Sequence, residues 1–298
     1  MLHVATGTLS SVQPFDFKHS LNFLGLFKPA MGQQVIENNT LTKAFYVADK
    51  VVVFRASHTT AAPQLDYAIW SEQPLTSTEQ QKAVEDISFF LSLQDDLNPF
   101  YTLAESDPDF MQVVQKLYGY HQVKFSLTAF ENACWAVISQ RNLMSLSFAM
   151  KARLTEQYGG RLQVEGLTYQ AFPQPHQLAL ATTDELNQII RNTRKAECIN
   201  AVAQAFANMD EMWLREAPLE QVKKWLLSIK GIGAWSASFV LVRGLGRVEE
   251  LPVDEKRLLE AARRVYRRPG LTFADIPKLA TDYGAYQGYW AHYLRAGG

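Results

Sequence analysis

The sequence predicts a mainly α-helical protein that begins with an α+β part. Three observations point to this class. Short runs rich in β-branched and aromatic residues lie within the first 104 residues, and apolar residues at the spacing of amphipathic helices dominate the rest of the chain. A Gly-x-Gly break also joins two apolar runs near residue 230, as a pair of helices in a hairpin requires. We therefore expect an α+β domain over residues 1–104 and a helical domain over residues 105–298.

Composition sets the broad class of protein. The chain has 298 residues, of which 47% are hydrophobic and 20% charged, as in a globular protein with a substantial core. No segment approaches the ~20 apolar residues that cross a membrane, and the N-terminus lacks the pattern of a signal peptide. Two cysteines, Cys134 and Cys198, are too few to supply the four thiolates of an iron–sulfur cluster, and they suggest a reducing compartment.

The net charge of −1 conceals an uneven distribution of charged residues. Ten acidic residues and a single base, Lys82, lie between Gln64 and Gln112, whereas eleven basic and five acidic residues lie between Lys223 and Arg268. Attraction to a polyanion depends on the local field, so the basic stretch predicts a nucleic-acid contact whose affinity falls steeply with salt. A solvated basic face without a partner is the alternative.

Short strands and one helix are expected in the α+β part. Phe45–Val47 and Val51–Arg55 are β-rich, and Phe15–Phe27 alternates apolar and polar residues. Thr76–Leu93 begins Thr-Ser-Thr-Glu, which is the pattern of a capping box, and continues with apolar residues at helical spacing. No constellation of residues in this part suggests chemistry.

The helical part is expected to contain a series of amphipathic helices. Gly159-Gly160 should end one of them, and Thr-Asp-Glu should begin another at Thr183. The expected helices span Asp109–Tyr118, Thr128–Gln140, Ser145–Tyr158, Thr183–Ile190, Arg194–Asn208, Pro218–Ile229, Ala234–Arg243 and Glu255–Tyr266, and Phe273–Leu294 finishes the chain.

The stretch Leu226–Asp254 organises the candidate chemistry. Gly231-Ile232-Gly233 makes a tight turn, and the helix that follows leaves its free N–H groups and the positive end of its dipole beside this turn. These groups suit one phosphate. About twenty residues later, Leu251-Pro252-Val253-Asp254 places one carboxylate at the head of the next helix.

Two interpretations of Asp254 are open. Asp is a favoured N-cap residue, so its role could be structural. An ionised carboxylate beside a nucleic-acid-binding turn could instead stabilise the positive charge that develops on a sugar when its N-glycosidic bond breaks, and could orient the attacking water. The two roles are compatible, because a capping position also fixes the side chain.

The hairpin, followed by Trp235 and a Pro-x-Asp, resembles the helix–hairpin–helix (HhH-GPD) DNA glycosylases, especially the 3-methyladenine DNA glycosylase II, or alkylation-repair, type. The blocks Phe130–Gln140 and Tyr286–Leu294 also look like this family, and the resemblance spans Ala129–Leu294. It implies two helical lobes around a cleft, plus a small antiparallel-sheet domain. It further implies a monofunctional enzyme of base excision repair. Such an enzyme flips alkylated purines, such as 3-methyladenine and 7-methylguanine, out of DNA and hydrolyses their N-glycosidic bonds.

Two other functions remain open, namely a non-catalytic helix–hairpin–helix DNA-binding protein and a monofunctional glycosylase for another damaged base. In branches of the family that also cut the DNA backbone, a lysine stands at the position of Trp235 and forms a Schiff base. The indole therefore implies that no strand cleavage occurs. The sequence departs from the family at Lys230, where Pro usually precedes Gly-Ile-Gly, and at Gln287, which often is Arg.

The resemblance assigns roles to individual residues. Asp254 is the catalytic acid, and an aromatic pocket attracts a cationic purine by ~0.5–2 kcal/mol. The pocket residues are Trp235, Tyr286, Phe239 and Gln140. The DNA-binding residues are Lys230, Gly231, Ile232, Gly233 and Ala234 of the hairpin, together with Arg141 and Asn142 of the turn after the Thr128–Gln140 helix. Arg141 either stacks in the gap left by the flipped base or contacts a phosphate.

The resemblance also bears on cofactors and partners. Backbone carbonyls of Leu227, Ile229 and Ile232 could hold a structural monovalent cation, and no other cofactor is expected. The expected partner is double-stranded DNA that contains a damaged base, bound by a monomer. No contact with a membrane is expected, and a bacterial protein of this kind would act in the cytoplasm at the nucleoid.

Overall fold

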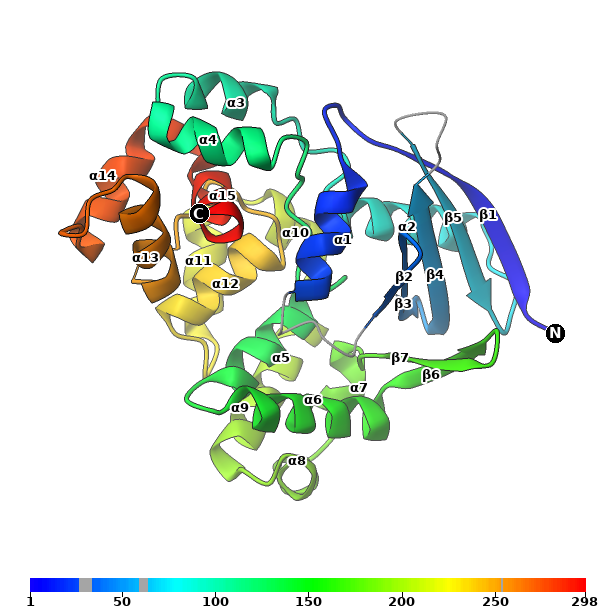
Figure 1. Ribbon diagram of the computed structural model, residues 1–298. Coiled ribbons are helices and arrows are strands. Elements are labelled where there is room, and N and C mark those ends of the chain that lie inside the picture. The colour runs from blue at the N-terminus through cyan, green and yellow to red at the C-terminus, as the bar shows by residue number, and fades with distance from the viewer. Residues whose placement is uncertain (27–33, 59–63, 253) are drawn as a thin grey trace.

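The structure, a computed structural model, describes residues 1–26, 34–58, 64–252 and 254–298. A five-stranded sheet lies at one end, and two groups of helices lie beside it (Figure 1). This arrangement of an α+β beginning and a mainly helical remainder confirms the predicted fold class. Val253 of the Pro-x-Asp pattern lies outside the described residues. Among those described, no helix combines the length and the apolar character needed to cross a membrane.

The N-terminal sheet is antiparallel, with the strand order β1-β5-β4-β3-β2. Successive side chains of β4 point to opposite faces of the sheet. Val52 packs with helices α1 and α2, whereas Val53 packs on the other face. The predicted β-rich runs lie in β3 and β4, and Thr76 and Glu79 form the predicted capping box of α2. The elements are β1 His3–Ser10, α1 Phe17–Leu26, β2 Val35–Glu37, β3 Thr40–Val47, β4 Lys50–His58, β5 Gln64–Ser71 and α2 Ser77–Phe90.

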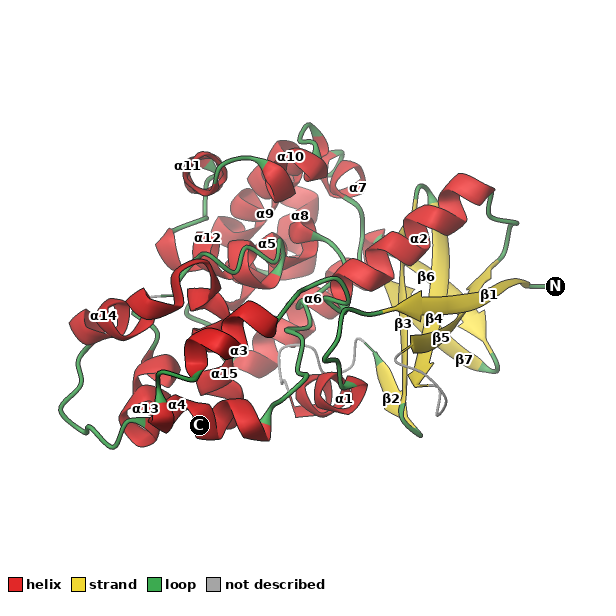
Figure 2. Ribbon diagram, turned by 90° about the horizontal axis from the view of Figure 1, so that it is seen from above, coloured by secondary structure: helices red, strands yellow, loops and turns green. Residues whose placement is uncertain are grey.

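A β-hairpin that the sequence analysis did not predict lies inside the helical part. Its strands, β6 (Gly160–Val164) and β7 (Leu167–Ala171), are joined by Glu165 and Gly166, which have positive φ of 51° and 82° as a type I′ turn requires. In Figure 2 the two strands lie beside the N-terminal sheet, and their apolar side chains pack against one face of it. Arg55 of β4 also pairs with Glu165 at 2.7 Å. The hairpin therefore fastens the helical part to the sheet.

The first helical group packs around α5 (Ala129–Ser139), in which every residue from Ala129 to Ile138 is buried. Helices α9 and α12 pack directly against it. Helix α6 ends at Tyr158, before Gly159, and α8 begins at Thr183, both as predicted. The remaining bounds are α6 Met144–Tyr158, α7 Pro175–Ala179, α8 Thr183–Ile190, α9 Thr193–Ala207, α10 Glu211–Glu216, α11 Leu219–Ser228 and α12 Ala234–Arg243.

The second helical group joins segments from both ends of the helical part. Phe100 of α3 and Phe110 of α4 share a core with Trp290 of α15. Helix α3 thus packs here although it lies within residues 1–104, the range predicted for the α+β domain, and that domain boundary stays a prediction. The elements are α3 Asn98–Ala104, α4 Pro108–Lys116, α13 Lys256–Val265, the 3-10 helix η2 Phe273–Asp275, α14 Ile276–Ala280, the 3-10 helix η3 Thr281–Tyr286 and α15 Gln287–Gly297. The C-terminal stretch is interrupted at Gly284, whose φ of 48° and ψ of −119° lie outside the helical region.

Candidate active site

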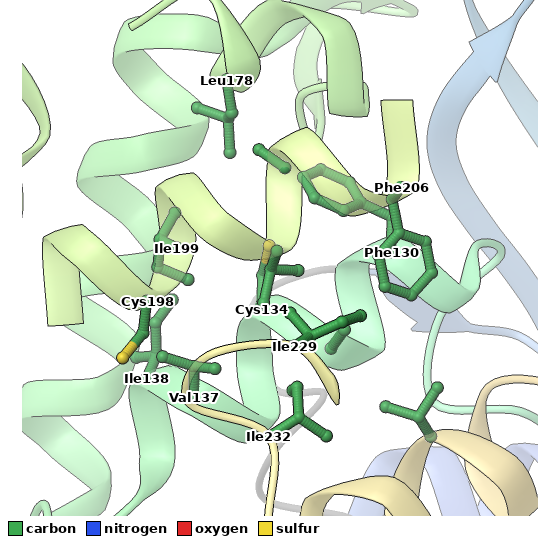
Figure 3. Packing of buried hydrophobic residues seen from close by; sticks show 14 of the residues in the cluster. Phe130, Cys134, Val137, Ile138, Leu178, Cys198, Ile199, Phe206, Ile229 and Ile232 are labelled. Carbon is green, nitrogen blue, oxygen red and sulfur yellow. The ribbon is translucent and has the colours of Figure 1, made fainter. Parts of the chain in front are cut away.

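The predicted helical hairpin is present and is anchored in the core of the first helical group. Helices α11 and α12 are joined by residues 229–233, and the N–H of Ile232 donates to the carbonyl of Ile229 at 3.0 Å. The side chains of Ile229 and Ile232 are buried between α5 and α9 (Figure 3). Two apolar anchors on this five-residue connection fix its position, while Lys230, Gly233 and the first residues of α12 are exposed.

The two glycines of the turn differ in what they tolerate. Gly231 has a φ of +94°, and a Cβ atom there would lie 2.6 Å from Cys198 Cβ and 2.7 Å from Cys198 Sγ. Gly233 has an ordinary φ of −98°, and no heavy atom lies within 4 Å of the Cβ that it lacks. Gly231 is therefore required by the close packing of the turn on α9. Gly233 leaves open space at the N-terminus of α12, where the predicted phosphate would bind.

Gln140 ties the end of α5 to the hairpin. Its Nε2 donates to the carbonyl of Gly231 at 2.8 Å and to Ser236 Oγ at 2.9 Å. Lys195 of α9 donates to three carbonyls at the end of α5, those of Val137, Ile138 and Gln140, at 2.8–2.9 Å. Burial lowers the pKa of Lys195, and its position opposes the negative end of the α5 dipole. Gln140 was predicted to line the base pocket, and the role of Lys195 was not predicted, because its three acceptors lie more than 50 residues away in the sequence.

Trp235 and Phe239 form an aromatic platform at the start of α12. Their rings stack with centroids 5.4 Å apart and an interplanar angle of 12°, and Phe239 meets the edge of Phe125 at 5.6 Å. Trp235 keeps 48% of its surface exposed, which is unusual for so large an apolar residue. The outer face of the indole is therefore available to another flat ring, while Phe239, itself packed on Phe125, supports its inner face.

Tyr286, the other predicted pocket aromatic, belongs to the second helical group. It is half-buried, stacks on Phe100 at 6.1 Å, and donates a hydrogen bond from its hydroxyl to the carbonyl of Asp96 at 3.2 Å. Among the described residues no ring contact joins it to Trp235. The structure thus brings Trp235 and Phe239 together and places Tyr286 in a separate aromatic cluster, and a shared base pocket remains a prediction.

Asp254 is exposed and adopts the left-handed backbone conformation, with a φ of +57°. The N-cap of α13 is the next residue, Glu255, whose side chain does not cap the helix. The proposal that Asp254 is an N-cap is therefore wrong: the helix begins one residue later than such a cap would require. No hydrogen bond to the Asp254 carboxylate forms within the described part of the chain, which leaves this acid accessible.

The turn between α5 and α6 carries the predicted contacts to the gap in the base stack. Arg141 is exposed with a φ of +53°. The amide of Asn142 donates to the carbonyl of Ile138 at 3.0 Å, so it closes the end of α5 instead of facing outward. Leu143, the N-cap residue of α6, is 78% exposed. Leu143 was not predicted as a site residue, because the sequence alone does not show that an apolar residue in a turn is exposed.

Several basic residues of the predicted basic stretch form ion pairs with acidic residues of the same chain. Lys223 pairs with Glu250 at 3.0 Å, Lys230 with Glu197 at 2.7 Å, and Arg247 with Glu249 at 2.6 Å. Arg243 is 5% exposed, and burial lowers its pKa to about 10. The local positive field is therefore weaker than the sequence count indicates.

The carbonyls proposed for a monovalent cation lie at the hairpin. Ile229 O already accepts the N–H of Ile232, which leaves it one further lone pair for a cation. Side chains offer no alternative among the described residues, where no group of three or more His, Cys, Asp or Glu could hold a metal ion. Cation binding through the backbone carbonyls of Leu227, Ile229 and Ile232 remains a prediction.

Proteins with similar sequences are named as DNA glycosylases. The chain is 26% identical over 285 residues to a DNA-3-methyladenine glycosylase of Bacillus subtilis (strain 168), which covers 94% of this chain and 93% of the relative. It is 27% identical over 161 residues to DNA-3-methyladenine glycosylase 2 of Escherichia coli (strain K12), covering 54% of this chain and 55% of that protein.

Solved structures share the fold. The 3-methyladenine DNA-glycosylase from Archaeoglobus fulgidus has a TM-score of 0.79 at 21% identity, with 97% of each chain covered. The 8-oxoguanine glycosylase/lyase of Clostridium acetobutylicum in its apo form has a TM-score of 0.72 at 17% identity, covering 100% of this chain and 99% of that one. The family model described as HhH-GPD superfamily base excision DNA repair protein matches residues 134–276. Residues 134–276 of this chain thus carry the HhH-GPD domain of base excision DNA repair proteins.

Proposed function

We propose that the protein is a monofunctional DNA glycosylase that removes alkylated purines from double-stranded DNA. The observation that carries this proposal is the exposed indole of Trp235, stacked on Phe239 directly after the hairpin. An aromatic face attracts the positive charge of an N3- or N7-alkylated purine by ~0.5–2 kcal/mol. The relatives named DNA-3-methyladenine glycosylase support the same substrate class.

The proposed reaction is a hydrolysis assisted by one carboxylate. The damaged nucleotide leaves the base stack, and its base lies against Trp235. The bond between C1′ and the base nitrogen breaks, and the electron pair stays on the purine, which departs as a neutral molecule because it carried a positive charge. The Asp254 carboxylate stabilises the cationic sugar and orients a water, whose oxygen bonds to C1′ as its proton passes to the carboxylate. No amine of the protein takes part.

A lesion panel with the wild-type protein tests this function. Duplexes with 3-methyladenine, 7-methylguanine, hypoxanthine, 1,N6-ethenoadenine or 8-oxoguanine are incubated, and free base and strand breaks are measured separately. We expect release of the alkylated bases and strand breaks only after alkali treatment. Release of neutral bases alone would instead support a glycosylase for another damaged base. Binding without release of any base would favour a non-catalytic DNA-binding protein. Nicking without alkali would require an amine nucleophile.

The protein also needs a residue to occupy the place of the flipped base, and Leu143 is the best candidate in the structure. Leu143 is 78% exposed, so its insertion into the base stack removes apolar surface from water, which is favourable. Arg141 lies two residues away and stays exposed, so it is suited to a neighbouring phosphate or base. We therefore assign insertion to Leu143 and leave Arg141 as a flanking contact.

Replacing Leu143 with Ala should lower the single-turnover rate of base release roughly 5–30-fold, the equivalent of about 1–2 kcal/mol of lost apolar contact. Fluorescence of 2-aminopurine beside the lesion should report less flipping. Leu146→Ala is the matched control, because Leu146 is 43% exposed on the same helix. A loss in Arg141→Ala with none in Leu143→Ala would assign insertion to Arg141.

A further inference from the structure

The segment from Arg247 to Glu255 connects α12 to α13 and carries Asp254. Within the described residues, no side chain donates a hydrogen bond to the Asp254 carboxylate, and this acid is exposed. An aspartate carboxylate stands only one carbon from the main chain, so its position follows that of the backbone. What holds the backbone on either side of Asp254 therefore determines where the acid stands relative to a bound sugar.

Residues 248–250 of this segment are held by α11 and α15. Lys223 Nζ of α11 contacts both carboxylate oxygens of Glu250, at 3.1 and 3.0 Å, and Glu250 is 4% exposed. From α15, the Gly288 N–H donates to Val248 O at 2.7 Å and Gln287 Nε2 donates to Glu249 O at 2.6 Å. A charge pair on a buried carboxylate and two hydrogen bonds to the main chain leave residues 248–250 little freedom.

The part after Asp254 is held by α15 as well. Arg295 Nη1 lies 2.6 Å from Glu255 Oε2, and both side chains are about one-fifth exposed, at 20% and 21%. Arg295 Nε also donates to the carbonyl of Ala291 at 3.2 Å, which fixes the direction of the guanidinium. Glu255 is adjacent to Asp254, so this pair holds the backbone one residue away from the acid.

We propose that Lys223 and Arg295 are positioning residues for Asp254, acting through Glu250 and Glu255. The inference rests on the proposed function, in which Asp254 is the catalytic acid. Lys223 lies on the first helix of the DNA-binding hairpin. Its pair with Glu250 therefore ties the hairpin and the acid into one unit, so that DNA held at the hairpin presents its sugar at a fixed distance from Asp254. Lys223 of the basic stretch thus holds the acid-bearing segment.

The test compares base release with DNA binding in Arg295→Met and Lys223→Met. Because small displacements of a reacting group cost up to ~10²-fold, we expect single-turnover release to fall about 10–100-fold in each variant. The dissociation constant for a duplex with an abasic-site mimic should change by no more than about twofold. Arg295→Lys keeps the charge and should recover most of the rate. Lys256→Met is the control, because Lys256 is 84% exposed and pairs only loosely with Glu260, at 3.7 Å.

Salt dependence separates positioning from DNA contact for Lys223. A lysine that binds a phosphate reduces the slope of log affinity against log salt by about 1 when it is removed, whereas a lysine held by Glu250 leaves the slope unchanged. Glu255→Gln should lower the rate as Arg295→Met does, and the double variant should add little to either. Thermal unfolding of each variant identifies the temperature range in which all are folded.

The proposal is overturned if folded Arg295→Met and Lys223→Met release base at the wild-type rate, or if their losses appear in DNA affinity and the salt slope. Its failure is distinguishable from failure of the proposed function. If only the positioning role is wrong, the wild-type protein releases alkylated bases and only the variants behave unexpectedly. If the proposed function is wrong, the wild-type protein itself releases none.

Discussion

Asp254→Asn is expected to lower the single-turnover release of 7-methylguanine by roughly 10²–10³-fold, the usual loss when one electrostatic stabiliser of a transition state is removed. The amide has the shape of the carboxylate but neither its charge nor its basicity. It can neither stabilise the cationic sugar nor accept the proton of the attacking water. The largest effect should therefore fall on the chemical step.

The fold should tolerate this substitution. Asp254 is exposed and has a φ of +57°, a conformation that Asn adopts at least as readily as Asp. The free energy of unfolding should stay within about 0.5 kcal/mol of the wild-type value. Affinity for a duplex with an abasic-site mimic should be retained as well, because the hairpin contacts are untouched. A combined loss of stability and binding would show that the lost rate does not report on the acid.

Asp282→Asn is a suitable control, because Asp282 is another exposed acid in the C-terminal part, on the 3-10 helix η3. It should leave the rate unchanged. Undiminished release by Asp254→Asn would remove this residue from the reaction and with it the mechanism proposed here. The measurement requires quenched single-turnover assays, since product release can mask a slower chemical step.

Local signals in the sequence placed several elements correctly. Helix α12 begins at Ala234 and ends at Arg243 as predicted, because a glycine break precedes it and an apolar run of helical spacing follows. The capping box at Thr76 predicted the start of α2, because its two partners, Thr76 and Glu79, lie within four residues of sequence. In each case the interactions that define the element are local, so the sequence carries them.

Other segments carried mixed local signals. The alternation of Phe15–Phe27 is typical of a strand, yet α1 forms there. Its buried residues Phe17, Leu21 and Leu24 have the four- and seven-residue spacing of one helical face. The hairpin β6–β7 was missed although Glu165-Gly166 is a turn signal, because its strands gain stability from the N-terminal sheet. Tertiary contacts decided both outcomes.

Long-range electrostatics could not be read from the sequence. The excess of bases between Lys223 and Arg268 suggested a DNA-binding face, but Lys223 pairs with Glu250, 27 residues away. Arg295 lies outside that stretch and pairs with Glu255, 40 residues away. A count of charges along the chain shows neither partner. The spacing in the sequence predicted that Asp254 follows the hairpin. The contacts that hold the backbone near Asp254 join residues far apart in the sequence, so only the structure shows them.

Gly231→Ala is expected to destabilise the protein by about 2–6 kcal/mol. Two costs combine. A residue with a side chain is strained at a φ of +94°, by roughly 1–3 kcal/mol, and overpacking a close contact costs a further ~1–3 kcal/mol. The new methyl group would lie 2.6 Å from Cys198 Cβ, on the rigid helix α9, so neither side can move away without disturbing the core. Denaturant unfolding followed by circular dichroism measures this change.

Gly233→Ala provides the contrast, because no atom lies within 4 Å of the added methyl group and the φ of −98° is ordinary. Its cost should be no more than about 1 kcal/mol, since Gly is only a modest N-cap residue.

The variants should also differ in function. Gly231→Ala displaces the carbonyl that accepts from Gln140 and thereby shifts the turn relative to α5, so affinity for an abasic-site duplex should fall even where the protein is folded. Equal stability and affinity in the two variants would mean that the turn moves freely on α9, and a hairpin that moves freely could not hold a sugar in register with Asp254.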